Sequence, residues 1–176
     1  MECNMNAFLL VIPLILIRYG LLSIISMDAL KRAGFFAPLM GMEKLAFWVY
    51  QTATAFILIY LLFLKIRIDS ERFYIGLIIY VLGIILYAVS IMNYARPKMS
   101  GMNLNGLYGL SRNPMYIAYF VYFLGCAFLT YSWILLGALI IFQISAHWIV
   151  LSEERWCIGE FGEEYIKYMK KVRRYI

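Results

Sequence analysis

The sequence predicts an all-α integral membrane protein with about five transmembrane helices, including a C-terminal helical hairpin, and an amphipathic cytosolic tail helix. Hydrophobic residues make up 64% of the 176 residues and charged residues only 15%, whereas soluble domains are about 45–50% apolar and about 25% charged. Several apolar runs are long enough to cross a bilayer, which takes about 20 residues. The sparse charges stand mainly at the ends of these runs.

This composition excludes an ordinary cytosolic enzyme, a disordered chain and a nucleic-acid-binding domain, because a soluble globule of this size cannot bury so many apolar side chains. The net charge of +6 and the pI near 9.2 come from basic residues that meet anionic lipid headgroups, so the bilayer is the expected partner. The three cysteines lack metal-ligand spacing and His147 is the single histidine. The sequence therefore predicts no metal site.

We expect a single membrane domain over residues 1–176, with a three-helix part (1–92) and a C-terminal part (93–176). The apolar runs predicted to span the membrane are residues 7–26, 45–64, 73–95 and the charge-free hairpin 113–152, which breaks near residues 130–132. The first run follows an acidic start and precedes no small-residue cleavage site, which favours a span over a signal peptide. Arg18 lies inside this span and either reaches the interface or has a structural or pocket role.

Charge asymmetry predicts the orientation of the bundle. The loop 96–112 carries three basic residues and no acid, and the tail after Ser152 is rich in lysine and arginine. Five spans place this loop and the tail on one side, and the positive-inside rule makes that side cytoplasmic. We therefore expect a cell-membrane protein with its N-terminus outside and its C-terminus in the cytoplasm. Residues 159–174 have helical spacing and predict an amphipathic helix on the membrane or folded back as a cap.

Unusual residues gather in two stretches, residues 93–116 and 147–164. In the first, Asn113 and Pro114 are typical of a helix start. A helix N-terminus offers free N–H groups to an anion, and the Arg112 guanidinium adds a fork of donors. Two interpretations stay open here: a site for a carboxylate or phosphate, or plain helix initiation beside an interfacial arginine.

The second stretch contains the adjacent acids Glu153 and Glu154. Neighbours on a helix point about 100° apart, so one can face the bundle while the other faces water. A carboxylate at the rim accepts hydrogen bonds from a polar ligand; the alternative is a solvated pair neutralised by Arg155. His147 on its apolar helix is more typical of a hydrogen-bonded interior residue than of a catalyst.

Together the two stretches resemble the C-terminal signature of the membrane-bound S-adenosylmethionine-dependent methyltransferases, a superfamily that includes isoprenylcysteine carboxyl methyltransferase and the phospholipid N-methyltransferases. The resemblance covers residue 93 to the end. The family pattern is G-x-Y, R-H-P-x-Y at the head of a hairpin, E-E, and F-G-x-x-Y. The matching segments here are 106–108, 112–116, 153–154 and 161–165, in that order.

The resemblance implies S-adenosyl-L-methionine as cofactor, in a pocket on the cytosolic side, and a lipid or lipidated acceptor. Arg112, Asn113 and Glu153 would position the reactants rather than act as acid or base. Carried over by position, the cofactor contacts would be Asn93, Ser100, Gly101, Met102, Asn103, Tyr108, Asn113, Pro114, Met115, Tyr116 and Glu153. Methyl transfer is an in-line displacement that needs mainly alignment and exclusion of water.

Two differences from the family pattern limit what the resemblance implies about the function of this chain. Asn113 replaces the motif histidine and cannot titrate near neutral pH. The isoprenylcysteine enzymes place a substrate-binding arginine where this chain has Ile149, with His147 nearby. These two residues are the candidate substrate contacts, and a prenylcysteine substrate is not carried over. An NADPH-dependent reductase of sterol-reductase type and a non-enzymatic small membrane bundle are the alternative functions.

Overall fold

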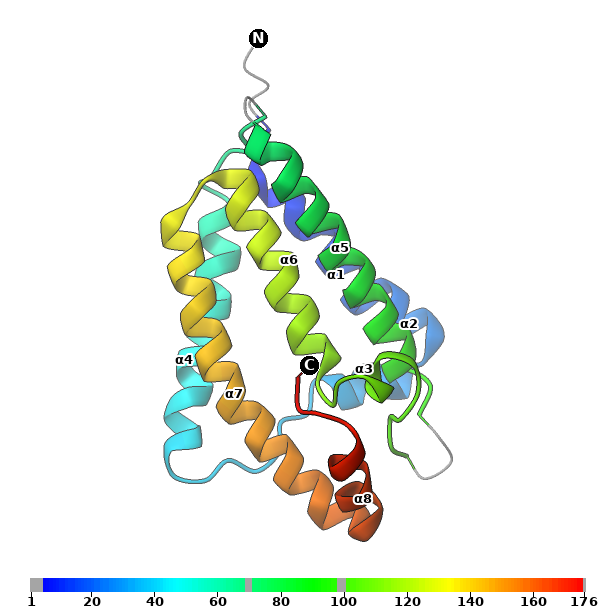
Figure 1. Ribbon diagram of the computed structural model, residues 1–176. Helices are drawn as coiled ribbons and strands as arrows, with labels where there is room; N and C mark the ends of the chain where they lie inside the picture. The colour runs from blue at the N-terminus through cyan, green and yellow to red at the C-terminus, as the bar shows by residue number, and fades with distance from the viewer. Residues whose placement is uncertain (1–4, 69–70, 98–100, 176) are drawn as a thin grey trace.

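The structure is a computed structural model that describes residues 5–68, 71–97 and 101–175, and every regular element in these ranges is helical (Figure 1). This confirms the predicted all-α class. In chain order the elements are the 3₁₀ helix η1 (Ala7–Val11), α1 (Ile12–Ile15), the π helix η2 (Leu16–Leu21), α2 (Leu22–Ile25), α3 (Met27–Ala33), α4 (Met42–Leu61), α5 (Glu71–Tyr94), the 3₁₀ helix η3 (Gly106–Gly109), α6 (Pro114–Thr130), α7 (Trp133–Phe161) and α8 (Glu163–Lys171).

Four stretches are long and apolar enough to cross a membrane: Ala7–Ile25, Met42–Leu61, Arg72–Tyr94 and Trp133–Phe161. The first joins η1, α1, η2 and α2 into one rod. α6 has 17 residues, which is the lower limit of about 17–25 for a span. The fifth crossing therefore stays a prediction that rests on α6.

The hairpin breaks where the sequence predicts. α6 ends at Thr130, and Tyr131 takes a left-handed conformation with φ 52°. The Ser132 hydroxyl then accepts a hydrogen bond of 3.1 Å from the Leu135 N–H and caps α7, as serine does at many helix starts. α7 continues past Ser152 to Phe161, so the hairpin is longer than expected.

The tail helix is shorter than the expected segment 159–174. Its first three residues belong to α7, because Gly162, at φ 54°, ends that helix before α8 begins. After α8 the chain is extended and returns to the head of α6. There the Arg112 N–H donates to the Arg173 carbonyl at 2.9 Å, so the C-terminus lies against the bundle (Figure 1).

Two helix pairs organise the bundle: α5 packs along α6, and α4 along α7. Glycines bring the backbones of α5 and α6 close together. A Cβ added at Gly83 would lie 2.5 Å from Tyr122 Cα, and one added at Gly125 would lie 2.5 Å from Tyr80 Cα. The Tyr80 and Tyr122 rings pack at 5.1 Å beside this contact, and both hydroxyls donate to the Leu10 carbonyl. Small residues allow this approach in membrane bundles.

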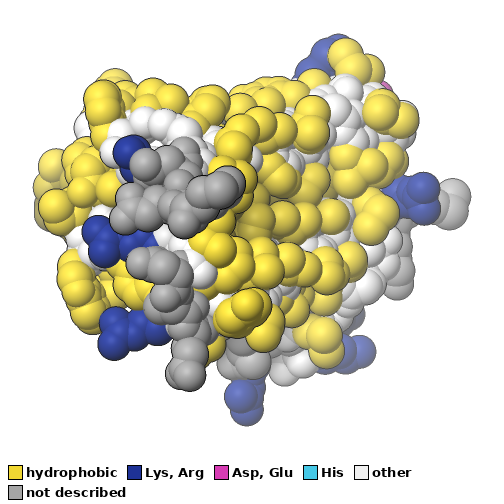
Figure 2. All heavy atoms as spheres, turned by 90° about the horizontal axis from the view of Figure 1, so that it is seen from above, with side chains coloured by type: hydrophobic (Ala, Val, Ile, Leu, Met, Phe, Trp, Pro, Cys, Tyr) yellow, Lys and Arg dark blue, Asp and Glu magenta, His cyan; other side chains and the backbone are white. Residues whose placement is uncertain are grey.

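The outer surface is apolar. Ile24, Phe63 and Trp133 expose 84%, 77% and 81% of their surface. Figure 2, seen from the end where α5 begins and α6 meets α7, shows mainly hydrophobic side chains on that face, with several Lys and Arg side chains among them and around the edge. Such a surface is suited to lipid rather than water. The orientation of the termini stays a prediction from charge.

We predict that Gly83→Ala destabilises the protein by about 1–3 kcal/mol, because the added methyl group overlaps the backbone of α6 and forces the helices apart. Thermal unfolding in detergent measures the effect as a lower Tm. Gly137→Ala on α7 is the matched control, because a Cβ there has nothing within 4 Å. Equal Tm values for the two variants would contradict the close packing of α5 on α6.

Candidate functional site

A cavity of about 760 Å³ opens at the end of the bundle where α3, α8 and the C-terminus gather (Figure 1). Its walls come from η2, α3, the loop after α3, α4, α5, the loop before η3, η3 itself, α6, α7 and α8. The volume lies in the range of about 300–1,000 Å³ that is usual for small-molecule sites. Residues distant in the sequence thus line one cavity beside the head of the hairpin.

Most of the residues that we predicted as cofactor contacts line this cavity: Gly101, Met102, Asn103, Tyr108, Asn113, Met115, Tyr116 and Glu153, with Arg112 beside them. Asn93 and Pro114 are not among the lining residues that the structure describes. Ser100 lies outside the described residues. The candidate substrate residues His147 and Ile149 also do not line the cavity; Ile149 is fully buried.

Asn93 does not line the cavity but holds a turn that does. Its side-chain Oδ1 accepts a hydrogen bond of 2.9 Å from the Leu107 N–H in η3. Gly106, at φ 54°, makes room for this contact, because a Cβ there would lie 2.2 Å from Asn93 Oδ1. Asn93 therefore fixes the turn that presents Tyr108. Burial raises the pKa of the Tyr108 phenol, so this group is protonated at neutral pH.

The two arms of the hairpin meet at Tyr116 and Glu153. Tyr116 lies in the first turn of α6, and its hydroxyl donates to Glu153 Oε1 at 2.9 Å. The Tyr50 ring of α4 packs against Tyr116 with 6.5 Å between centroids. The hydrogen bond occupies one carboxylate oxygen of Glu153. The other oxygen is available to hydrogen-bond donors of a ligand.

Glu154 is buried and paired, so the alternative of a solvated acidic pair neutralised by Arg155 is wrong. Its side chain is 5% exposed and lies 3.1 Å from Arg112 Nη2 and 2.8 Å from Arg174 Nη2. Hydrogen bonding to Glu154 raises the pKa of Arg174. α7 continues through both acids, so neither opposes the dipole of a helix C-terminus. Arg112 is likewise buried in this pair, not an interfacial anchor.

Arg155 instead fastens the loop between α3 and α4. It forms a two-pronged ion pair with Glu43, with N–O distances of 2.5 and 2.6 Å, and donates to the Pro38 carbonyl at 2.9 Å. The Phe35 and Trp156 rings pack at 5.5 Å beside this pair, and both line the cavity. The loop is therefore held across α7 as one wall of the site.

Asn113 holds the C-terminal tail. Its Nδ2 group donates to the Arg174 carbonyl at 3.1 Å, and the Ser111 hydroxyl donates to the same oxygen at 3.2 Å. His147 is hydrogen bonded to the Tyr175 hydroxyl at 3.0 Å, which agrees with an interior role. Asn113 thus has a function here that requires a donor but no titration.

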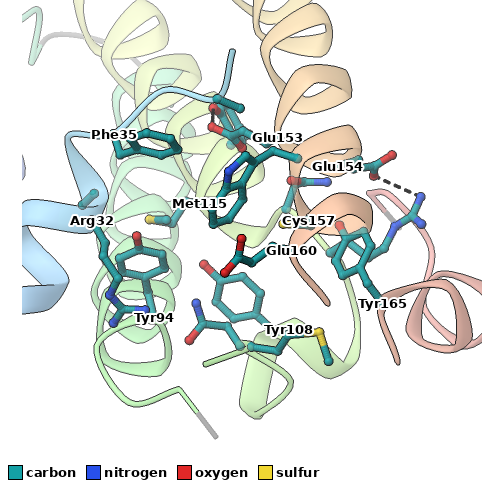
Figure 3. A pocket seen from close by; sticks show the side chains of 18 of the residues that line it. Arg32, Phe35, Tyr94, Tyr108, Met115, Glu153, Glu154, Cys157, Glu160 and Tyr165 are labelled. Atoms are coloured by element: carbon teal, nitrogen blue, oxygen red, sulfur yellow. Dashed lines mark hydrogen bonds and ion pairs between the residues drawn. The ribbon is translucent and has the colours of Figure 1, made fainter. Parts of the chain in front are cut away.

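Several cavity residues escaped the sequence analysis. Figure 3 shows Glu160 between Arg32 and Tyr94 on one side and Tyr165 on the other. A signal for Glu160 was present, because it follows Glu153 by seven positions and so shares its helix face. The sequence offered no such signal for Arg32 and Tyr94, because their positions in the cavity depend on how α3 and α5 meet α7.

We predict that Glu154→Ala destabilises the protein by about 3–5 kcal/mol, because it leaves the buried guanidinium of Arg112 without its partner. Thermal unfolding in detergent measures the change. Glu163→Ala is the matched control: its partner Lys167 is 3.9 Å away and both side chains are exposed, so Tm should not change measurably. A control variant as unstable as Glu154→Ala would contradict the buried pair.

Asn113→Asp should loosen the C-terminal tail while preserving the helix start, because aspartate cannot donate to the Arg174 carbonyl and the Asn113 side chain makes no capping hydrogen bond to α6. We expect faster hydrogen exchange at residues 172–175 than in the wild type. Exchange in the middle of α6 should be unchanged. If residues 172–175 of the variant exchange at the wild-type rate, Asn113 does not hold the tail.

Comparison with known proteins identifies one matching family. A family model described as phospholipid methyltransferase matches residues 71–164, which is more than half of the chain and includes α5, α6, α7 and the acidic pair. No curated protein and no solved structure matches the chain. Family membership indicates a membrane methyltransferase that acts on lipid-like substrates. The chain belongs to the phospholipid methyltransferase family.

Proposed function

We propose that the protein transfers a methyl group from S-adenosyl-L-methionine to a membrane-soluble or lipid-like acceptor at the cytosolic rim of the bundle. The observation that carries this proposal is the meeting of Tyr116 and Glu153 across the hairpin, 2.9 Å apart, inside a cavity of about 760 Å³. The family match favours methyl transfer over reduction by NADPH and over a purely structural bundle.

The cavity residues fit this cofactor. S-adenosylmethionine carries a carboxylate, an ammonium group, ribose hydroxyls and a sulfonium. Two buried polar atoms at the cavity, Arg112 Nε and Asn103 Oδ1, have no hydrogen-bond partner among the described residues. The first suits a carboxylate and the second an ammonium or hydroxyl group. Glu153 adds an acceptor, and the Tyr108 ring offers an aromatic face to a cation.

The cofactor, when bound, supplies a methyl group activated by the sulfonium. The chain's own residues then act by placement, because in-line displacement requires alignment and a dry site. Tyr116 fixes the Glu153 carboxylate, and Arg112 is fixed by Glu154. The Glu43–Arg155 pair holds the loop after α3, which lines the cavity and shields it from water, and Asn113 holds the tail beside the head of α6. The apolar exterior lets an acceptor approach from the lipid.

The test is cofactor binding by the purified full-length protein in detergent, measured by isothermal titration calorimetry. Glu153→Ala should weaken the affinity for S-adenosylmethionine roughly 10- to 100-fold, as expected for the loss of hydrogen bonds to a charged group. Tyr116→Phe should weaken it less, because the carboxylate remains. Glu164→Ala is the matched control, since Glu164 is exposed on α8 and does not line the cavity.

Saturable binding of NADPH without binding of S-adenosylmethionine would overturn the proposal in favour of a reductase. A second measurement follows radiolabelled methyl groups into total membrane lipids, lipidated peptides and small thiols. Transfer into any of these by the wild type, lost in Glu153→Ala, supports the proposal. Complete absence of labelled product would count against an active methyltransferase.

A further inference from the structure

Three cations of the cavity come from the N-terminal part of the chain. Arg18 lies on η2, and Lys31 and Arg32 lie on α3; all three line the cavity. We call these three residues the basic wall. They stand outside residues 71–164, the region matched by the family model. The proposed cofactor contacts, in contrast, lie within that region.

Arg18 shows why the basic wall calls for an anion. It lies in the middle of an apolar span, where an uncompensated charge is costly. Its guanidinium donates to the Tyr119 hydroxyl at 3.0 Å and to the Ala33 carbonyl at 2.6 Å. Both acceptors are neutral. A guanidinium has five N–H donors, so further donors are available to a ligand.

The other two cations also lack acidic partners. The ion pairs between described residues include Arg112, Arg155, Lys167 and Arg174, but no member of the basic wall. Arg32 instead lies over the Tyr94 ring, 5.3 Å from its centroid. Cations that line a cavity and form no ion pair with the described residues favour binding of a phosphate or carboxylate.

Charge is segregated across the cavity. Glu153, Cys157 and Glu160 share one face of α7, so the acids lie on that helix. Figure 3 shows Arg32 beside Tyr94 on the side opposite Glu154 and Tyr165. Arg112 does not add to the basic wall, because Glu154 neutralises it at 3.1 Å. The acidic face suits the cationic groups of the cofactor and leaves the basic wall for a second ligand.

We propose that the methyl acceptor carries an anionic group, a phosphate or a carboxylate, and that Arg18, Lys31 and Arg32 bind it. The inference rests on the function proposed above and adds the residues that select the acceptor. Lys31 and Arg32 are exposed at the mouth and meet the anion first, and Arg18 holds it farther in. The cofactor's own carboxylate is the competing anion, and the experiment separates the two.

The experiment measures three dissociation constants for the full-length protein in neutral detergent: those of decyl phosphate, decanol and S-adenosylmethionine. The wild type should bind decyl phosphate at least about tenfold more tightly than decanol, and more weakly at high salt. Arg18→Gln and Arg32→Gln should each weaken decyl phosphate binding about tenfold. Affinity for S-adenosylmethionine should change less than about twofold.

Lys44→Gln is the matched control, because this exposed cation lies in the first turn of α4 and does not line the cavity. It should leave all three constants unchanged. Arg18→Lys should restore part of the binding of decyl phosphate, because the charge remains. Arg18 also holds Tyr119 and Ala33, so Tm is measured for each variant; Arg32→Gln tests the proposal even where Arg18→Gln is unstable.

Equal wild-type affinity for decyl phosphate and decanol would overturn the inference, as would unchanged binding in Arg32→Gln. Loss of S-adenosylmethionine binding in Arg32→Gln with decyl phosphate unaffected would overturn it as well, since the basic wall would then serve the cofactor. A wild type that binds decyl phosphate but no S-adenosylmethionine refutes the proposed methyl transfer and leaves the anion site standing. The two failures are therefore distinguishable.

Discussion

The buried carboxylate of Glu154 is the constraint on which the site depends. It joins three segments, because Arg112 precedes α6, Glu154 lies within α7 and Arg174 belongs to the last residues of the chain. A buried charge is tolerated only when it is paired and hydrogen bonded, so these segments are fixed relative to one another. The rotation of about 100° between neighbours on a helix then leaves Glu153 facing the cavity, where Tyr116 holds it.

Much of the fold follows from local sequence. Apolar runs predict the long helices, and Ser132 marks the start of α7 because its hydroxyl accepts from an N–H of the first turn. The end of α7 could not be predicted in the same way. The predicted hairpin ends at Ser152 because the charge-free run ends there, but α7 continues and Glu154 is neutralised by arginines from two other segments. Only tertiary structure brings those arginines near.

The site likewise contains residues that could be predicted from local sequence and residues whose role depends on tertiary structure. Tyr108, Tyr116 and Glu153 were predicted because the residue types and their order resemble a known signature, and all three line the cavity. Arg18 was noticed as a charge within a span, yet its role stayed open between interface and pocket. The structure places it in the cavity through Tyr119 and the Ala33 carbonyl. Neither contact follows from spacing, because one partner lies on α6 and the other follows a bend in the chain.

The cavity holds several charged side chains within an otherwise apolar protein. Ion pairs strengthen as water is excluded, so the loop after α3, which lines the cavity, also strengthens the electrostatic interactions within it. Arg155 fastens the loop after α3 through Glu43, and Asn113 fastens the tail. Both fastenings use polar groups at the rim, which leaves the lipid-facing side apolar. In the proposed transfer, a charged cofactor enters this cavity from water and a lipid-like acceptor enters from the bilayer, which suits a reaction that depends on alignment.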